Sequence, residues 1–240
     1  MDPRSVLITG GSRGIGAAIA RTFAARGDRV AVTYRSRPPE PGALPDGVLA
    51  LPCDVTDGEQ VGTAVEQAVQ AHGPVQVLVA NAGIVQDALL LRMSERDFTG
   101  VVDTNLTGAF RLVKAVSPRM LRARDGRIVL VSSAVALRGE AGQANYAASK
   151  AGLVGLARSL AREFGSRSVT VNVVAPGLTE TDMSAALTEQ QRAALVAQIP
   201  LGRLARPAEV AAAVDFLASP EAGYITGAIL PVDGAAGTGH

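Results

Sequence analysis

The chain has 240 residues, a formal net charge of +1 and 48% hydrophobic residues, with no tryptophan. This length suits one α/β domain, and the near-zero charge gives no overall field to attract nucleic acid or a membrane surface. A single cysteine, Cys53, excludes an intrachain disulfide framework and a cysteine-rich zinc site. The first apolar run, Val6-Leu7-Ile8, leads straight into a glycine-rich turn, and no run is long enough to span a bilayer. We therefore expect a cytoplasmic protein without a metal site that binds neither nucleic acid nor membrane.

Short apolar runs alternate with longer helical stretches along the chain. The expected strands are Ser5–Thr9, Arg29–Tyr34, Val48–Pro52, Val75–Ala80, Arg127–Ser132, Thr170–Val174 and Ala228–Val232. The expected helices are Gly14–Ala25, Gly58–Gln70, Ser94–Leu121, Asn145–Phe164 and Ala208–Leu217. This βαβ alternation predicts an α/β chain with a single-domain Rossmann fold, built on a doubly wound, mostly parallel, seven-stranded sheet. Prolines between Tyr34 and Val48 exclude the helix expected there and predict a loop.

A glycine-rich segment, VLITGGSRGIG, runs from Val6 to Gly16 and follows the first expected strand. Its glycines are spaced GxxxGxG, a variant of the dinucleotide fingerprint that lets the backbone approach a pyrophosphate at a helix N-terminus. The alternative is a purely structural turn, but the context of strand, turn and helix favours nucleotide binding. The expected cofactor contacts in this loop are Gly10, Ser12, Arg13, Gly14, Ile15 and Gly16.

The end of the second expected strand indicates which nucleotide binds. NAD enzymes usually place an acidic residue there for the ribose 2′-hydroxyl, whereas this chain has Tyr34-Arg35-Ser36-Arg37. Arginine side chains suit the 2′-phosphate of NADP, so Arg13 and Arg35 predict NADP(H) as the cofactor. The alternative is that both are ordinary surface arginines.

Two further segments follow the third and fourth expected strands. Asp54, in CDVTD, is either an acceptor for the adenine amino group, with Val55 beside it, or the N-cap of the next helix. The residues alone leave these two interpretations equal. Asn81, Ala82 and Gly83 form a turn that lets the cofactor ribose pass close to the backbone.

The segment QANYAASK, from Gln143 to Lys150, places Tyr146 four residues before Lys150. Positions four apart share one face of a helix, so a lysine ammonium would favour the phenolate and lower the pKa of the tyrosine. Such a tyrosine can donate a proton near neutral pH. The alternative is an alanine-rich helix with a core tyrosine and a solvated lysine, and the octapeptide alone leaves the two about even.

Together, TGxxxGIG, NAG, a serine before YxxxK, and Pro176-Gly177 with a following threonine resemble the short-chain dehydrogenase/reductase family over essentially the whole chain. Within the family, NLTGAF, GQANYAASKAG, NVVAPG, ETDM and ITGAILPVDG are most similar to the 3-oxoacyl-[acyl-carrier-protein] reductases of the FabG type. The proline-rich segment 35–47 and the terminal GTGH resemble the MabA-like subgroup. Ala235 departs from the usual second glycine after VDG, and Arg138 brings a bulky cation to the loop after the serine.

The resemblance implies four catalytic residues: Asn105, Ser133, Tyr146 and Lys150. It selects Ser133 over Ser132, because the family's serine lies thirteen residues before its tyrosine. Tyr146 would donate a proton to the substrate carbonyl and Ser133 would polarise it, while Lys150 lowers the phenol pKa and binds the nicotinamide ribose. Asn105 would hold a water that links Lys150 to solvent. Further implied cofactor contacts, besides Tyr146 and Lys150 themselves, are Pro176, Gly177, Thr179 and Thr181.

By the same resemblance, the expected reaction is the NADPH-dependent reduction of a 3-oxoacyl-[acyl-carrier-protein] to its 3-hydroxyacyl form, in fatty acid or related polyketide biosynthesis. The alternatives are a short-chain reductase that acts on another ketone or secondary alcohol, such as a polyketide, a steroid or a small molecule, and a nucleotide-sensing protein without turnover.

The resemblance also implies partners. We expect a homotetramer that packs through the small residues of Asn145–Phe164 and through the last strand, with an acyl carrier protein delivering the substrate. Residues 179–203 are expected to close over an acyl chain as a lid lined by Met183, Leu187, Leu195, Ile199 and Leu201. Arg124 and Arg167 resemble basic docking positions for the acidic carrier, on the rim near the active-site mouth.

Overall fold

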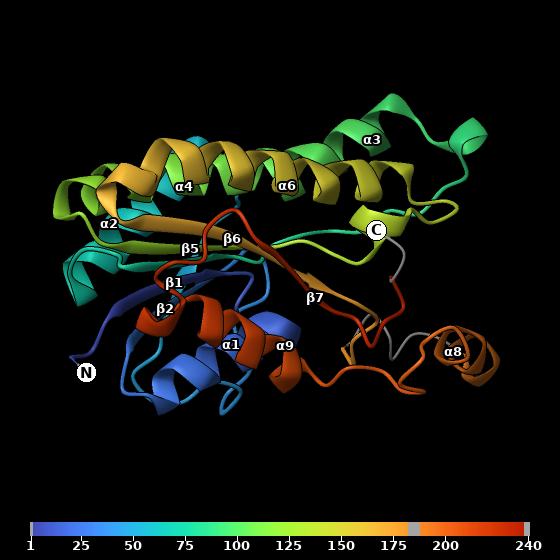
Figure 1. Ribbon diagram of the computed structural model, residues 1–240, viewed down its shortest axis with the longest axis horizontal. Coiled ribbons are helices and arrows are strands. Elements are labelled where there is room, and N and C mark those ends of the chain that lie inside the picture. Colours follow the sequence, from blue (N-terminus) through green and yellow to red (C-terminus); the bar gives the residue numbers. More distant parts are fainter. Residues whose placement is uncertain (1, 182–187, 238–240) are drawn as a thin grey trace.

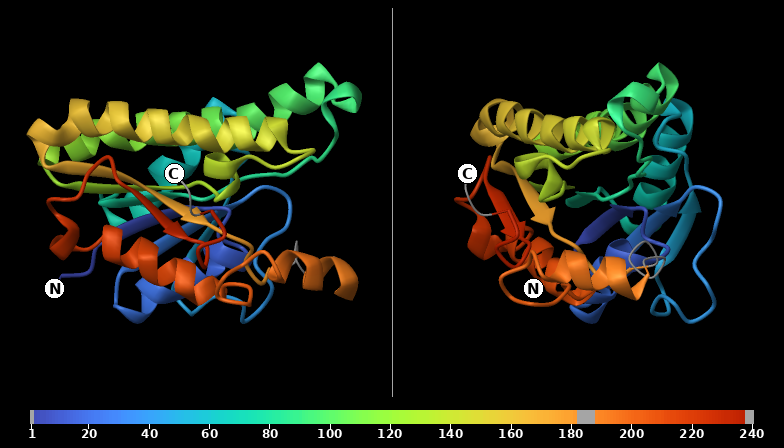
Figure 2. Two further views of the ribbon diagram at one scale, coloured as in Figure 1. Left: turned by 45° about the vertical axis from the view of Figure 1, so that its right-hand side comes forward. Right: turned by 90° about the vertical axis from the view of Figure 1, so that its right-hand side faces the viewer.

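Three layers make up the computed structural model, which describes residues 2–181 and 188–237, with helices on both faces of one sheet (Figures 1 and 2). The described residues form a seven-stranded sheet in the order β3-β2-β1-β4-β5-β6-β7, and every neighbouring pair is parallel. The strands are β1 (Ser5–Thr9), β2 (Arg29–Tyr34), β3 (Leu49–Pro52), β4 (Val77–Ala80), β5 (Gly126–Val131), β6 (Val169–Pro176) and β7 (Ile229–Val232). The predicted doubly wound α/β sheet is therefore confirmed.

Two sets of helices cover the sheet. One face carries α2 (Gly58–His72), α4 (Gly108–Ala123) and α6 (Ala144–Phe164), and the other carries α1 (Gly14–Ala25) and α9 (Pro207–Leu217) (Figure 1). Shorter helical pieces complete the described chain: α3 (Glu95–Val102), α5 (Val135–Arg138), α8 (Glu189–Val196), η1 (Leu90–Arg92), η2 (Asp103–Thr107), η3 (Gly165–Arg167) and η4 (Pro220–Ala222). Within the described residues, every helix is too short or too polar to cross a membrane.

The strands are buried on both faces because helices cover both. All five residues of β1 and all eight of β6 are buried, as expected for central strands of a parallel sheet. Alternate side chains then enter opposite cores: Leu7 packs under α2 and α4, whereas Val6 and Ile8 pack over α1 and α9. This rigid centre holds the carboxyl ends of the strands in a fixed row.

The largest difference from the predicted elements lies in the stretch Ser94–Leu121, which was expected to be one helix. The structure instead has α3, a π-helical segment η2 over Asp103–Thr107, and then α4. The helical path continues through η2, but its wider turn changes which residues face the sheet. Asn105 lies within this π-helical segment. π-helical turns of this kind are frequent at functional sites.

Smaller differences concern strand ends. β4 begins at Val77 rather than Val75, and β6 runs on to Pro176, because Ala175 and Pro176 still pair with β7. A proline is tolerated at that last position, where the ladder no longer needs its N–H. The predicted loop between β2 and β3 is confirmed, since the described residues 35–48 contain no helix.

Candidate active site

The glycine-rich loop joins the end of β1 to the start of α1. Gly10 and Gly14 have φ angles of +64° and +55°, a conformation that favours glycine. A Cβ on Gly16 would lie 2.2 Å from the carbonyl oxygen of Gly10, so the loop folds tightly against the first turn of the helix. The result is a backbone cradle at a helix N-terminus, which fits a pyrophosphate.

Asn81 and Thr9 fasten this cradle to the end of β4. Asn81 Nδ2 donates to the carbonyl oxygens of Thr9 at 2.9 Å and Gly10 at 3.1 Å. In return, Thr9 Oγ1 accepts from the backbone N–H groups of Asn81 and Ala82, both at 3.1 Å. The Asn81 side chain therefore holds the loop, and Thr9 is a residue that the sequence analysis missed. Its signal was a hydroxyl at the end of an otherwise apolar strand.

The expected 2′-phosphate residues lie next to this cradle. Gly11 N–H donates to the carbonyl oxygen of Thr33 at 3.0 Å, which brings the glycine loop to the end of β2. Arg35 follows β2 directly, and both Arg13 and Arg35 are exposed. Two exposed guanidinium groups near a pyrophosphate cradle fit the extra phosphate of NADP.

Asp54 does not cap α2, so that interpretation is wrong. Asp57 is the cap, because its side chain accepts from the N–H groups of Glu59 and Gln60. Asp54 Oδ1 instead accepts from Thr56 N at 2.9 Å and Thr56 Oγ1 at 2.8 Å. Val55 is buried, and Val55 Cγ2 would meet a Cβ on Gly108 at 2.8 Å. Contact of Asp54 and Val55 with adenine stays a prediction.

Tyr146 and Lys150 lie in the first turns of α6 and approach Ser133, which follows β5. The Ser133 side chain lies close enough to the Tyr146 phenol to act on its pKa, which it lowers. Lys150 is 4% exposed; its Nζ donates to the carbonyl oxygen of Val131 at 2.8 Å and lies 5.8 Å from the centre of the Tyr146 ring. The structure thus brings all three side chains together at the carboxyl end of β5.

The adjacent serines have different partners. Ser132 is buried, and its Oγ donates to the carbonyl oxygen of Lys150 at 2.8 Å. Ser133 is partly exposed, accepts from Val135 N at 3.2 Å, and lies near the Tyr146 phenol, whose pKa it lowers. The hydroxyl of Ser132 is therefore used inside the fold, whereas that of Ser133 faces the phenol.

Burial is the largest influence on the pKa values of Tyr146 and Lys150. It raises the pKa of Tyr146, an effect that the Ser133 hydrogen bond opposes and the Asp87 carboxylate reinforces. It lowers the pKa of Lys150 to about 8. The expectation that Lys150 lowers the phenol pKa is not met in this structure, because Lys150 Nζ donates to the Val131 carbonyl oxygen and burial raises the pKa of Tyr146.

Asn105, in the π segment η2, is buried and fully engaged with protein. Its Oδ1 accepts from Ile84 N at 2.8 Å, and its Nδ2 donates to Ile84 O and to Ser149 Oγ, each at 3.0 Å. Both N–H groups of the Asn105 side-chain amide are already used. A water held by Asn105 would therefore have to donate to one of the oxygens of Asn105, in the side chain or the backbone. A Cβ on Gly83 would lie 3.1 Å from Asn105 Oδ1 and 3.2 Å from Lys150 Nζ, so these two atoms border the same turn.

Asn145 is a second residue that the sequence analysis missed. Its side chain is completely buried. Oδ1 accepts from the N–H of Tyr146 at 2.8 Å, while Nδ2 donates to Gln86 O at 2.9 Å and Asp97 O at 3.3 Å. It thereby fixes the start of α6 against the loop after β4. The signal was a polar residue directly before the tyrosine, but its partners are far away in sequence.

Comparison with known proteins agrees with this arrangement. Residues 10–236 match the family described as enoyl-(acyl carrier protein) reductase. The chain is 50% identical over 237 residues to the 3-oxoacyl-[acyl-carrier-protein] reductase MabA of Mycobacterium tuberculosis, covering 99% of this chain and 94% of the relative. It is 50% identical over 239 residues to the FabG reductase of Escherichia coli, covering 97% of each. The chain belongs to the short-chain dehydrogenase/reductase family.

As a member of this family, the chain is an oxidoreductase with a nicotinamide cofactor, as predicted. The short-chain reductase cradle receives one more segment, the turn after β6. Gly177 N–H donates to Val232 O at 3.0 Å, and Thr179 Oγ1 donates to Gly177 O at 3.0 Å. Thr181 Cγ2 would lie 3.4 Å from a Cβ on Gly14, so this turn reaches the glycine loop.

The expected lid of the reductase is described only at 179–181 and 188–203, and Met183 and Leu187 lie outside the described residues. In the described part, Ile199 is 7% exposed, whereas Leu201 is 67% exposed. A Cβ on Gly234 would lie 2.8 Å from Ile199 and 3.4 Å from Leu201, so the segment after β7 packs beneath the lid. There, Ala235 has a φ of +69°.

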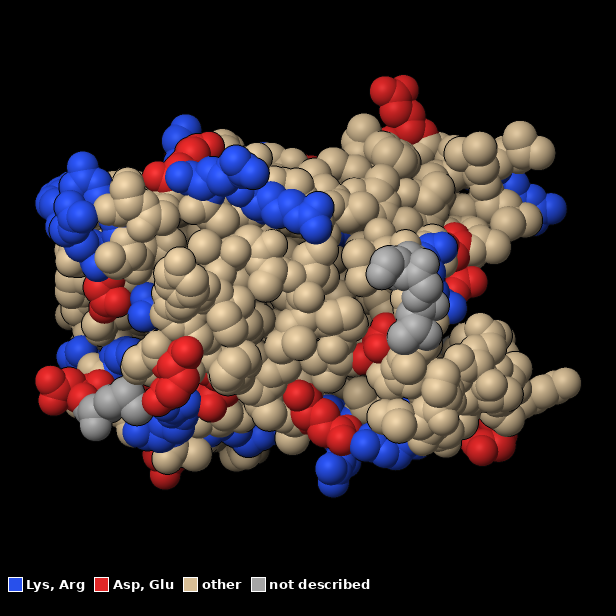
Figure 3. All heavy atoms as spheres, in the orientation of Figure 1, with Lys and Arg blue, Asp and Glu red and all other residues tan. Residues whose placement is uncertain are grey.

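Arg124 and Arg167 were predicted to lie on the rim near the active-site mouth. Within one chain this prediction is wrong. Both α4 and α6 start at the catalytic end and run back toward the amino ends of the strands, and α6 has 21 residues. At 1.5 Å per residue, its end lies about 30 Å from Tyr146. Arg124 and Arg167 follow these helix ends, where Lys and Arg side chains gather (Figure 3).

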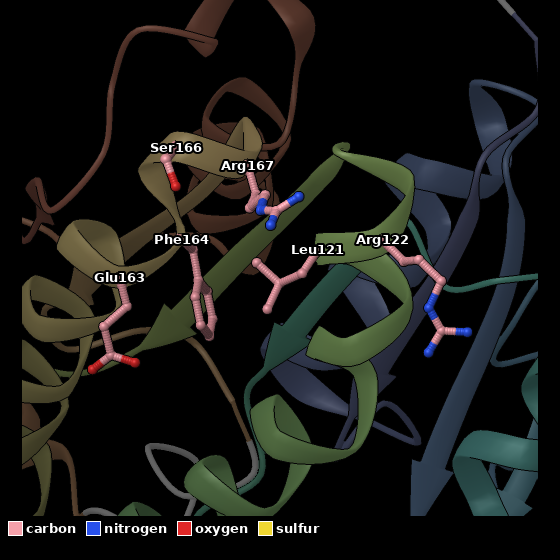
Figure 4. Close-up of a pocket in the computed structure, with 6 residues that line it drawn as sticks. All are labelled: Leu121, Arg122, Glu163, Phe164, Ser166 and Arg167. Atoms are coloured by element: carbon pink, nitrogen blue, oxygen red, sulfur yellow. The ribbon is translucent and has the colours of Figure 1, made fainter.

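A shallow recess lies at this same distant end, between the last turns of α4 and α6 (Figure 4). Its apolar floor is formed by Leu121 and Phe164, and Arg122, Glu163, Ser166 and Arg167 complete its lining. Arg124 Nη2 donates to the carbonyl oxygen of Ser166 at 2.9 Å, which ties the two helix ends together. The recess is therefore separate from Ser133, Tyr146 and Lys150.

Proposed function

We propose that this short-chain reductase converts 3-oxoacyl-[acyl-carrier-protein] thioesters to 3-hydroxyacyl thioesters with NADPH. The observation that carries the proposal is that Ser133 and the Tyr146 phenol lie together beside the buried Lys150, whose Nζ is 5.8 Å from the centre of the Tyr146 ring. Two hydroxyl groups that meet in this way can both address one carbonyl oxygen. The names of the full-length relatives supply the substrate class.

NADPH supplies the hydride when it is bound, and the residues of the chain bind, orient and handle the proton. Ser133 Oγ holds and polarises the substrate carbonyl oxygen. Tyr146 donates its phenolic proton to that oxygen as the adjacent carbon is reduced, which makes Tyr146 the general acid. Lys150 and Asn105, whose Nζ and Oδ1 border the same turn, lie on the route by which the phenol regains a proton.

The matched family is described as an enoyl reductase, which gives a second candidate reaction. Ketone reduction needs a proton on the carbonyl oxygen itself, whereas enoyl reduction saturates a carbon–carbon double bond. The Ser133–Tyr146 pair is suited to an oxygen that develops negative charge, so it favours the ketone. Comparing both thioesters decides between them.

The deciding experiment measures NADPH oxidation with acetoacetyl and crotonyl thioesters of coenzyme A and of acyl carrier protein, together with small free ketones. The proposal expects kcat/KM for acetoacetyl thioesters at least a hundredfold above that for crotonyl thioesters and free ketones. Tyr146→Phe is the control for background oxidation. A preference for the crotonyl thioester, or equal rates on a free ketone, would reject the 3-oxoacyl assignment.

Cofactor selectivity and location are part of the proposal. Arg13 and Arg35, both exposed and joined to one cradle, support NADP(H) over NAD(H). A cytoplasmic location stays a prediction, which fractionation of cells tests.

A homotetramer is the proposed assembly. On α6, Ala148, Ala151 and Gly155 are exposed, and on α4, Phe110 is 47% exposed, which leaves an apolar helical face for a second copy. Gly152 does not belong to this face, because its Cβ would lie 2.6 Å from Leu106 of the same chain. β7 is an edge strand with an open side for a second pairing. Sedimentation equilibrium tests the assembly, and a stable monomer at micromolar concentration would reject it.

In this assembly, Arg124 and Arg167 of one copy can take part in carrier docking at the active site of another copy, which they cannot do within one chain. A two-fold axis perpendicular to α6 packs the helices of two copies antiparallel. The end of α6 in one copy then lies near Tyr146 of the other. In this arrangement the basic helix ends of a second copy flank the active-site mouth, where they attract an acidic carrier protein.

A further inference from the structure

The side chain of Ser149 connects two of the expected catalytic residues. Ser149 is completely buried in α6, one residue before Lys150. Its Oγ donates to the carbonyl oxygen of Tyr146 at 2.8 Å and accepts from Asn105 Nδ2 at 3.0 Å. A serine inside a helix commonly bonds a carbonyl one turn earlier, but helix geometry does not by itself bring a donor from another element.

The bond to Asn105 matters because it joins two separate elements. Asn105 belongs to the π segment η2, and its remaining side-chain bonds all go to Ile84 in the loop after β4. Ser149 is therefore the residue that ties this amide to α6. Without the hydroxyl, one N–H of a side chain that is 1% exposed would lose its acceptor.

The helix itself has little need for a hydroxyl at this position. Neighbouring Ala147 and Ala148 show that small apolar residues suit this part of α6. The value of Ser149 must then lie in what it contacts. Asn105 Oδ1 and Lys150 Nζ border the same turn at Gly83, so a shift of the amide changes the surroundings of the ammonium.

We propose that Ser149 is a positioning residue that holds Asn105 in register with Tyr146 and Lys150, so that the phenol regains its proton as fast as it is used. Ser149 touches neither substrate nor the reacting atoms and acts through Asn105 and the backbone of Tyr146. This inference rests on the proposed function.

The first test compares Ser149→Ala with Ser5→Ala on the acetoacetyl thioester. Ser5 is a matched control, because it is 1% exposed and its Oγ also donates to a backbone carbonyl, that of Gly73, at 3.1 Å. Ser149→Ala should lower kcat about five- to twentyfold, leave KM for NADPH within about twofold and raise the solvent deuterium isotope effect on kcat. Ser5→Ala should leave all three values near those of the wild type.

Two further variants separate hydrogen bonding from packing. Ser149→Cys fills the same space with a poor donor and acceptor, so it should behave like Ser149→Ala. In an Asn105→Ala background, Ser149→Ala should cost less than about twofold in kcat, because the bond is already gone. A full and independent loss in that background, or a Ser149→Cys enzyme with wild-type kcat and isotope effect, would overturn the inference.

A measurement without substrate keeps the inference apart from the proposed reaction. Hydrogen exchange should become at least about fivefold faster at Ile84 and across residues 103–107 in Ser149→Ala and Ser149→Cys, and not in Ser5→Ala. A wild-type enzyme inactive on every thioester would reject the proposed function, whereas this measurement would still decide the role of Ser149. Unchanged exchange in both Ser149 variants would mean that the residue does not hold the π segment.

Discussion

Lys150 Nζ donates to the main-chain carbonyl oxygen of Val131 at 2.8 Å, so the buried ammonium sits at the tip of β5 rather than against the phenol four residues away. This bond satisfies one of its three donors. The proposed contacts of Lys150 with the cofactor ribose and with the proton route would use its other two donors. The free energy of burying it has a measurable consequence.

Stability should depend on pH through Lys150. Burial lowers its pKa from the usual 10.5 to about 8, so the unfolded chain binds more protons between these values. In cofactor-free protein, the free energy of unfolding should therefore rise by about 1–3 kcal/mol from pH 8 to pH 10 through this group. Urea denaturation of wild type and Lys150→Met measures it, and the same pH dependence in both would contradict the assignment.

Tyr146→Phe should lower kcat by about 10²- to 10⁴-fold, because it removes the general acid and little volume. The affinity for NADPH should stay nearly unchanged, whereas Lys150→Ala should lower both kcat and affinity. Steady-state kinetics and NADPH fluorescence titration give the two values. Ser132→Ala tests the choice between the serines: its loss of kcat should be much smaller than that of Ser133→Ala, since Ser132 bonds the Lys150 backbone.

The preference for NADPH over NADH should be at least about tenfold in kcat/KM, from charge-assisted hydrogen bonds to the 2′-phosphate. Arg35→Ala should remove most of it while leaving turnover with NADH unchanged. Arg21→Ala, an exposed arginine of α1, is the control. A wild-type enzyme without preference, or a mutant that keeps it, would show that other residues choose the cofactor.

Gly16→Ala should damage the nucleotide site, because the added Cβ would lie 2.2 Å from Gly10 O. The backbone fixes the position of a Cβ, so only a shift of the loop could relieve this contact. We expect a loss of about 1–3 kcal/mol in stability and a weaker NADPH complex. Gly62→Ala is the matched control: it lies in α2 with nothing within 4 Å of the added Cβ, and should stabilise the protein by about 0.5–1 kcal/mol. Thermal unfolding with and without NADPH separates the two outcomes.

Charge reversal at the distant helix ends tests carrier docking. Arg124→Glu with Arg167→Glu should raise KM for the carrier-bound substrate at least about fivefold, in a manner that weakens with salt. KM for the coenzyme A thioester should stay within twofold. Arg21→Glu with Arg29→Glu, on exposed residues of α1 and β2, controls for net charge. Losses on both substrates would indicate damage to the assembly instead of the docking site.

Much of this architecture was predictable from local patterns. The runs VLIT, VAVT and NVVAP are continuous and apolar, which is how strands covered on both faces look, and six of the seven expected strands end within one residue of the observed ends. The π segment was not predictable, because DTNLT continues the helical pattern on either side. The choice between Ser132 and Ser133 came from family spacing alone, and only their partners show the physical difference.

The bonds of Asn145 and Ser149 join residues 40 to 60 positions apart, and nothing local in the sequence reports them. The misplaced Arg124 and Arg167 are a different case. A helix that follows a parallel strand must run back to the amino edge, so the alternation already implied that both arginines lie far from Tyr146. That conclusion needed topology, which a family position by itself does not give.

The two ends of the described chain differ in a way that matters for making reagents. Gly237 N–H donates to Asp233 Oδ2 at 3.0 Å, and a Cβ on Gly237 would lie 3.7 Å from Ala134, the neighbour of Ser133. The first strand instead begins among the amino ends of the parallel strands, whereas Ser133 follows the carboxyl end of β5 (Figure 1). Affinity tags, dyes and surface tethers therefore belong at the amino terminus, because Gly237 lies beside the loop that carries Ser133.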